Sequence, residues 1–86
     1  LAQKPVKERL AEALLMLKEF FGVEEDGSTI KGSLTREEIA NIVGTATETI
    51  IRLLSELKKR NIIELEGKKI KILNHQALLR ITHVFD

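Results

Sequence analysis

The 86-residue sequence contains no cysteine, no tryptophan and no tyrosine, and its aromatic residues are three phenylalanines. Without cysteine, the chain has no disulfide, no thiolate metal ligand and no cysteine nucleophile. With so few aromatic residues, a hydrophobic core must be built from aliphatic side chains. No apolar run approaches the roughly 20 residues that cross a bilayer, and no secretory signal pattern is visible. We therefore expect a cytoplasmic protein without membrane contact.

An excess of one charge sign is also missing, since the formal net charge is +1. Apolar residues make up 43% and charged residues 31% of the chain, as in a folded globular domain rather than a disordered one. Residues 1–26 carry a net charge of −2, whereas residues 27–86 carry +3. The small excess of positive charge in residues 27–86 therefore favours a polyanionic partner, but only to a modest extent. The chain starts at Leu1 rather than Met, which indicates a piece of a longer protein.

Patterns that carry catalysis are absent from the sequence as well. We find no paired nucleophile and base, no metal-ligand set and no phosphate-binding loop, and we expect neither an enzyme nor a metal or cofactor site in this domain. The acidic triplet 24–26 lacks metal-loop spacing and predicts a solvated loop. His75 and His83 have no second His or Cys at ligand spacing, so we interpret both as surface residues.

Residues 35–60 predict two short helices joined by a tight turn. Thr35 and Glu38 form a capping box that opens the first helix, and Gly44 stands where a helix end favours a left-handed residue. Thr45 and Glu48 repeat the capping-box pattern, and we expect the second helix over residues 46–60. Its apolar stripe consists of Ile50, Leu53, Leu54 and Leu57.

The spacing within this stretch is that of a helix-turn-helix. In a frame that starts at Arg36, the small residue Ala40 is fifth, Gly44 is ninth, and the apolar Ile50 and Leu53 are fifteenth and eighteenth. A small fifth residue lets the helices cross, the glycine makes the turn, and the two apolar residues seal the pair. In DNA-binding proteins the second helix enters the major groove. Two packed helices of a structural bundle are the alternative.

A helix is also predicted before this stretch, from Pro5 to about Phe21. Apolar residues at helical spacing form its core face: Val6, Leu10, Ala13, Leu14, Leu17 and Phe21. We expect its charged residues to face outward: Lys7, Glu8, Glu12, Lys18 and Glu19. Gly22 ends the helix. The weakly alternating residues 29–34 predict at most a short edge strand.

The last third of the chain predicts a hairpin and a short helix. Residues 62–66 and 69–73 are strand-like and flank Gly67-Lys68, whereas Asn61 and Asn74 are placed to cap the neighbouring helices. A helix-turn-helix followed at once by a hairpin is a winged helix. The expected fold is thus mainly α with a small β wing: one domain over residues 1–86, with a three-helix core, a β-hairpin and a short C-terminal helix over residues 75–81.

Residues 34–73 resemble the C-terminal winged-helix domain of the Crp/Fnr family of bacterial transcription regulators, and the likeness extends back to Val6–Leu10. The residues that carry it are Leu34-Thr35-Arg36, Ile39-Ala40, Ile42-Val43-Gly44, Glu48-Thr49 and Arg52. The resemblance implies that an N-terminal effector-sensing domain and a long dimerising helix precede this segment in the parent protein.

The resemblance also implies which residues read DNA. In the family a Glu and, four residues later, an Arg of the recognition helix contact bases, and Glu48 and Arg52 match these positions. Arg52 can donate to guanine O6 and N7, and Glu48 can accept from cytosine N4. A surface ion pair between the two is the structural alternative. The sequence departs from the family at Thr47, where some members have Arg, and at Ile51, where many have a small residue. If Ile51 faces the groove, it would either touch a thymine methyl group or narrow the choice of base.

Hydroxyl and basic side chains near this helix and the hairpin tip are candidates for contacts with DNA phosphates. They are Thr35, Arg36, Thr45, Thr49, Lys58, Lys68 and Lys69. The implied partner is double-stranded DNA with a two-fold symmetric site, bound by a homodimer under the control of an unidentified effector, and the resemblance allows contact with RNA polymerase. The competing function is a winged-helix protein-interaction module without sequence-specific DNA binding.

Overall fold

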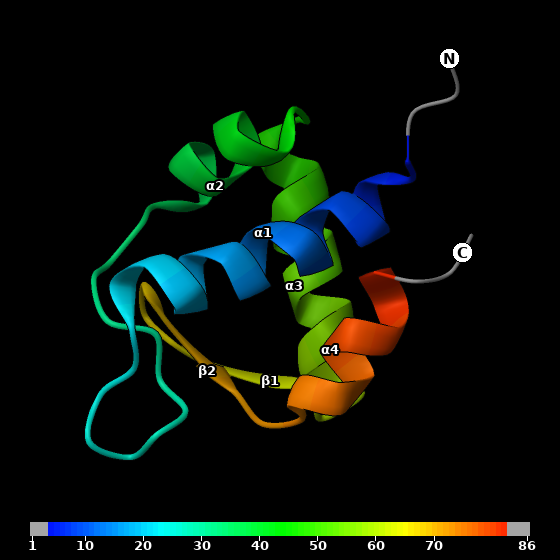
Figure 1. The fold of residues 1–86 in the computed structure, drawn as a ribbon. Helices are drawn as coiled ribbons and strands as arrows, with labels where there is room; N and C mark the ends of the chain where they lie inside the picture. Colours follow the sequence, from blue (N-terminus) through cyan, green and yellow to red (C-terminus); the bar gives the residue numbers. More distant parts are fainter. Residues whose placement is uncertain (1–3, 83–86) are drawn as a thin grey trace.

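The computed structural model describes residues 4–82, which form four helices and one antiparallel pair of strands (Figure 1). Their order is α1 (Val6–Phe21), α2 (Arg36–Val43), α3 (Thr47–Lys59), β1 (Ile63–Glu66), β2 (Lys69–Ile72) and α4 (His75–Thr82). This arrangement confirms the winged helix with a three-helix core, a hairpin and a short last helix. Within the described part, no helix combines the length and hydrophobicity needed to cross a membrane.

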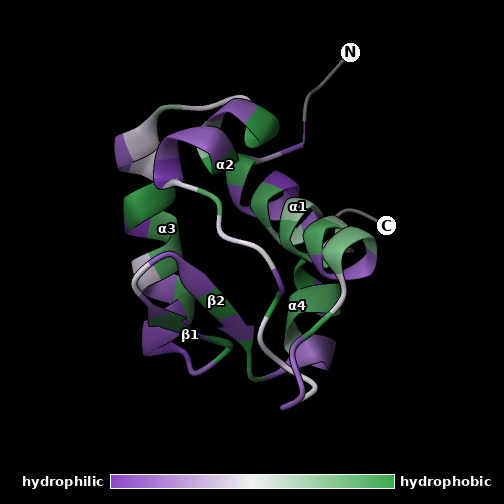
Figure 2. Ribbon diagram, turned by 90° about the vertical axis from the view of Figure 1, so that its left-hand side faces the viewer, coloured by the Kyte–Doolittle hydropathy of each residue, from purple (hydrophilic) through white to green (hydrophobic). Residues whose placement is uncertain are grey.

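An aliphatic core holds these elements together. Helix α2 packs on α1 and α3, α4 packs on α1, and β1 packs on α3. Every labelled helix carries both hydrophobic and hydrophilic residues, as expected of helices that cover one core (Figure 2). The large apolar side chains that are fully buried come from all six elements except β2: Leu10, Leu14, Ile39, Ile50, Leu54, Leu57, Ile63 and Leu78.

The buried face of α1 differs from the predicted stripe at two positions. Glu8, expected to face outward, is only 2% exposed, whereas Phe21, expected in the core, is 41% exposed. Because α2 and α4 both pack on α1, its buried surface is wider than one stripe and extends to Ala11 and Glu8. At the other end of α1, Phe21 makes an edge-to-face contact with the exposed ring of Phe20.

The turn between α2 and α3 confirms one predicted cap and corrects the other. Both bonds of the first capping box are present, and Gly44 has the left-handed φ of 83°. The second box is wrong: Ala46 is the N-cap of α3, and it makes no side-chain bond. The reason is that the N–H of Thr45 donates to the carbonyl oxygen of Ala40, 3.0 Å away. Thr45 therefore still closes α2, and α3 begins later.

Helix α3 ends in a Schellman motif. The N–H of Ile62 donates to the oxygen of Leu57 and that of Asn61 donates to the oxygen of Lys58, at 3.0 and 2.9 Å. Asn61 has a φ of 59°, which Asn tolerates better than most residues. The predicted cap thus lies one residue beyond the C-cap itself, which is Arg60. The motif turns the chain directly into β1.

The hairpin is the wing, and it is supported along one edge. Strands β1 and β2 pair antiparallel, and Glu66 opposite Lys69 frames the Gly67-Lys68 turn. Residues 28–31 run beside β2 and form one isolated bridge with it, between Thr29 and Lys71, rather than a strand. The N–H of Ile30 donates to Ile70 O, and that of Ile72 donates to Ser28 O. This segment pairs backbone groups of β2 that would otherwise form an open edge.

The loop before this segment is held by Asp26. Its carboxylate accepts from the side chain and the backbone N–H of Thr29 and from the N–H of Ser28, and these bonds lower its pKa from 3.8 to about 2. The acidic triplet 24–26 is therefore a structured turn at the surface.

Helix α4 begins as predicted and extends one residue further. The Asn74 side chain accepts from the N–H of Ala77, which confirms the predicted cap. His75 is exposed, and its Nδ1 lies 3.0 Å from Nζ of Lys18. His83 lies outside the described residues.

Candidate nucleic-acid interface

Helix α3 has a buried face and an opposite face open to solvent. The apolar stripe of Ile50, Leu53, Leu54 and Leu57 is buried, as predicted. Six residues of the helix are exposed and recur at helical spacing: Glu48, Ile51, Arg52, Ser55, Lys58 and Lys59. Ser55 was not among the predicted contacts, although its spacing of three residues from Arg52 places it on the same face. Counting along the helix from Arg52 would have found it.

Arg52 and Glu48, the two predicted base readers, do not pair with each other. Nη1 of Arg52 lies 2.9 Å from Oε2 of Glu56, one turn further along α3, and the two side chains are 65% and 41% exposed. Glu48 lies in the first turn, where the positive end of the helix dipole stabilises a carboxylate. Among residues 4–82, no hydrogen bond or ion pair of the Glu48 side chain is found. A pair as exposed as Arg52–Glu56 contributes only about 0.3–0.5 kcal/mol, so Arg52 can leave it for a base.

The hydroxyl residues surround the start of α3. Thr47 and Thr49 are half-buried in its first turn, and Thr45 is half-buried in the preceding turn. Thr35 uses its hydroxyl oxygen as the acceptor of the α2 cap, 3.0 Å from the N–H of Glu38. Because a capped hydroxyl still has its own hydrogen to donate, the cap does not exclude a phosphate contact.

Two of the predicted phosphate-binding lysines are ion-paired within the domain. Nζ of Lys69 lies 2.9 Å from Glu24, and Nζ of Lys58 lies 3.5 Å from Glu64. Lys68, at the wing tip, is exposed, and no ion pair within 4.0 Å is found for it in the described part of the chain. Its positive charge is close enough to help lower the pKa of Glu38, an effect mainly due to the bonds from Thr35. Lys68 is thus the more available cation of the wing.

Arg36 is committed to a contact within the domain. Its Nη2 donates to the carbonyl oxygen of Gly67 at 2.8 Å and so joins the first residue of α2 to the wing tip. Its Nη1 is buried, with no hydrogen-bond partner in the described residues. The side chain predicted to contact phosphate therefore faces the wing.

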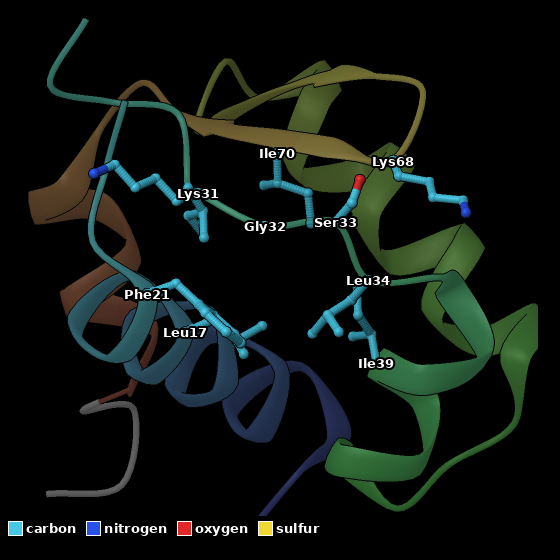
Figure 3. Close-up of a pocket in the computed structure, with 10 residues that line it drawn as sticks. Leu17, Phe21, Lys31, Gly32, Ser33, Leu34, Ile39, Lys68 and Ile70 are labelled. Carbon is cyan, nitrogen blue, oxygen red and sulfur yellow. The ribbon is translucent and has the colours of Figure 1, made fainter. Parts of the chain in front are cut away.

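Behind the wing lies a small apolar cavity between α1, the 30–34 segment and β2 (Figure 3). Its volume is about 20 Å³, which holds about one water molecule. Leu17, Phe21, Leu34, Ile39 and Ile70 line it, and Lys68 lies at its rim with its amino group directed away. A drug-sized ligand needs a pocket of roughly 300 Å³ or more, so this space is not one. Within residues 4–82, no group of three or more acidic or His side chains is arranged to hold a metal ion.

Comparison with known proteins identifies the fold and its relatives. Residues 8–81 match the family of Crp-like helix-turn-helix domains. The chain is 40% identical, over 73 residues, to a CRP-like cAMP-activated global transcriptional regulator of Mycobacterium tuberculosis, covering 84% of the chain and 33% of that protein. It is 36% identical, over 85 residues, to the fumarate and nitrate reduction regulatory protein of Vibrio cholerae, covering 98% of the chain and 34% of that protein.

A solved structure agrees with these matches. The crystal structure of a CRP/FNR-family transcriptional regulator from Thermus thermophilus superposes with a TM-score of 0.84 at 30% identity, covering 96% of this chain and 43% of that one. The chain spans about a third of the length of the two curated relatives.

Proposed function

This chain belongs to the Crp/Fnr family of transcription regulators, and from that premise we propose that it is the DNA-binding part of such a regulator, with α3 as its recognition helix in the major groove. The observation that carries the proposal is the exposed face of α3. It presents a long cation, a carboxylate and an apolar side chain at helical spacing, opposite a fully apolar buried face. Because the outer helix of a bundle can also be charged, this face points to DNA through its place in the second helix of a Crp-like helix-turn-helix.

Four side chains of α3 are proposed to read bases. Arg52 donates to guanine O6 and N7, and Glu48 accepts from cytosine N4, one helical turn away on the same face. Ile51 is 53% exposed and offers an apolar surface to a thymine methyl group. Thr47 stands in the first turn, where recognition helices approach base edges most closely.

The phosphate contacts are proposed to surround this helix. The wing contributes Lys68 and, once its pair with Glu24 opens, Lys69. The hydroxyl groups of Thr35, Thr45 and Thr49 lie at the starts of α2 and α3, where backbone N–H groups also favour an anion. Lys58 is available at the far end of α3. Each lysine contact adds affinity that falls with salt and carries no sequence information.

The whole protein is proposed to act as a homodimer on a two-fold symmetric site, since two copies of α3 would then occupy successive major grooves. Its effector would bind outside this chain, RNA polymerase would be a further partner, and the protein would work in the cytoplasm, where bacterial DNA lies. An isolated copy should bind DNA weakly. It lacks the second subunit of the dimer, whose binding to the other half-site is favoured by the high effective concentration that the first contact creates.

The proposal is tested by fluorescence-anisotropy titration of this chain with two duplexes. One is a two-fold symmetric duplex that the chain itself has enriched from a random pool, and the other is a scrambled version of it. We expect tighter binding to the enriched duplex at two salt concentrations, weakened by salt. Arg52→Ala should cost about 1–3 kcal/mol on the enriched duplex, or about 5- to 150-fold in Kd, and little on the scrambled one. Arg80→Ala, which removes the same charge from α4, is the matched control.

Equal losses on both duplexes would mean that Arg52 contacts only the backbone. An absence of DNA binding even at low salt would favour the second candidate, a protein-interaction module. The small net charge of +1 is the observation that keeps that candidate in view.

A further inference from the structure

Arg36 occupies an unusual place for a cation. It is the first residue of α2, where the positive end of the helix dipole disfavours a positive side chain. Its guanidinium instead reaches the wing, where Nη2 donates to the carbonyl oxygen of Gly67 at 2.8 Å. The two residues are 31 positions apart in the sequence. The bond therefore ties the tip of the hairpin to the start of the helix-turn-helix.

The rest of the hairpin is held by other contacts. Strand β1 packs on α3 at the base, and residues 28–31 pair with β2 through the bonds Ile30 N–H to Ile70 O and Ile72 N–H to Ser28 O. The turn residues Gly67 and Lys68 lie beyond the last paired residues, Glu66 and Lys69. The Gly67 carbonyl thus has no partner in the strand ladder, and the Arg36 bond secures it.

The same geometry argues against a direct phosphate contact by Arg36. A phosphate oxygen must reach a guanidinium N–H group, yet Nη1 is buried and Nη2 already uses one of its two N–H groups for Gly67, so few donors of Arg36 are left for a phosphate. Lys68, adjacent to Gly67, is exposed, and its amino group points away from the cavity behind the wing (Figure 3). Of these two cations, Lys68 is the one placed to meet DNA, and Arg36 fixes the backbone that carries it.

We propose that Arg36 is a positioning residue that holds the Gly67-Lys68 wing tip against the start of α2, so that Lys68 meets the DNA backbone. The second half of this inference, that Lys68 then meets the DNA backbone, rests on the proposed DNA-binding function. Its first half, the fixing of the tip, concerns the free domain alone.

The first half is tested by NMR relaxation on this chain without DNA. In Arg36→Ala we expect the backbone order parameters of Gly67 and Lys68 to fall from about 0.85 toward 0.6, while those of α3 stay unchanged. Arg80→Ala, the matched loss of an arginine from α4, should leave the tip rigid. Thermal unfolding of both variants verifies that they are folded. Unchanged order parameters at the tip in a folded Arg36→Ala chain would overturn the proposal.

The second half is tested by a double-mutant cycle in DNA binding. Arg36→Ala should weaken affinity about fivefold to tenfold when Lys68 is present, but less than about twofold in a Lys68→Ala background. The slope of log affinity against log salt should fall by about one in either single variant and hardly further in the double variant.

The outcomes separate the two proposals. If the fold-losses in DNA affinity of the two single variants multiply in the double variant, Arg36 contacts DNA independently of Lys68. That result would overturn its role as a positioning residue. If the unmodified chain binds no DNA at low salt, the proposed function fails and the second half fails with it, whereas the order parameters still decide whether Arg36 holds the tip.

Discussion

Replacing Glu8 with methionine should stabilise this domain, contrary to the usual effect of a core substitution. Glu8 is 2% exposed, and neither carboxylate oxygen has a hydrogen-bond partner in the described residues. The nearest cation found there is Nζ of Lys4 at 3.7 Å, and the Lys4 side chain is 52% exposed and closer to Glu12, at 2.6 Å. A buried carboxylate with so little compensation disfavours folding.

The size of the effect follows from three contributions. Removing an unsatisfied buried polar group gains about 1–3 kcal/mol. Against this, the substitution loses the attraction between Glu8 and the N-terminal end of the α1 dipole, about 0.3–1 kcal/mol, and the partly exposed pair with Lys4, about 0.2–1 kcal/mol. The net gain is about 1 kcal/mol. Methionine suits the site because it matches glutamate in length and in helix propensity.

Thermal unfolding followed by circular dichroism is the assay. A gain of about 1 kcal/mol raises the Tm of a domain this size by about 4–8 °C. Glu12→Met is the matched control, since Glu12 lies one turn further on α1 with a side chain that is 41% exposed, and it should change the stability by less than about 0.5 kcal/mol. A Tm that falls by several degrees in Glu8→Met would refute the reasoning, because it would show that the buried carboxylate is well compensated.

Two further predictions concern charged groups at the surface. Glu56→Gln frees Arg52 from its ion pair at 2.9 Å and should tighten DNA binding about twofold, as measured by anisotropy; weaker binding would mean instead that Glu56 orients Arg52 toward the base. The pKa of Asp26 is lowered from 3.8 to about 2, so its bonds to Thr29 and Ser28 contribute stability above pH 3.8 that is lost as the pH falls toward 2. The urea midpoint of the unmodified chain should therefore fall more between pH 4 and 2 than that of Asp26→Asn, and parallel curves would contradict this.

The sequence predicted what depends on neighbours within a few residues. The first capping box, the left-handed Gly44, the Asn74 cap and the two-residue wing turn are local features, and each is present. The buried stripe of α3 follows from helical period alone, and its exposed face, with Glu48 and Arg52, follows from the same count.

Tertiary structure decided what depends on residues far apart or on which neighbour covers a surface. Glu8 is buried because two helices pack on α1, which a single helical stripe does not reveal. Thr45 closes α2 instead of opening α3, since its N–H finds the Ala40 carbonyl. Arg36 bonds to Gly67, 31 residues away, and Lys69 to Glu24, 45 residues away. Sequence by itself determined helix α3 and its exposed side chains. Only the fold determined which basic residues remain available for the proposed contact with DNA, because a charge is available only where no distant group has already paired with it.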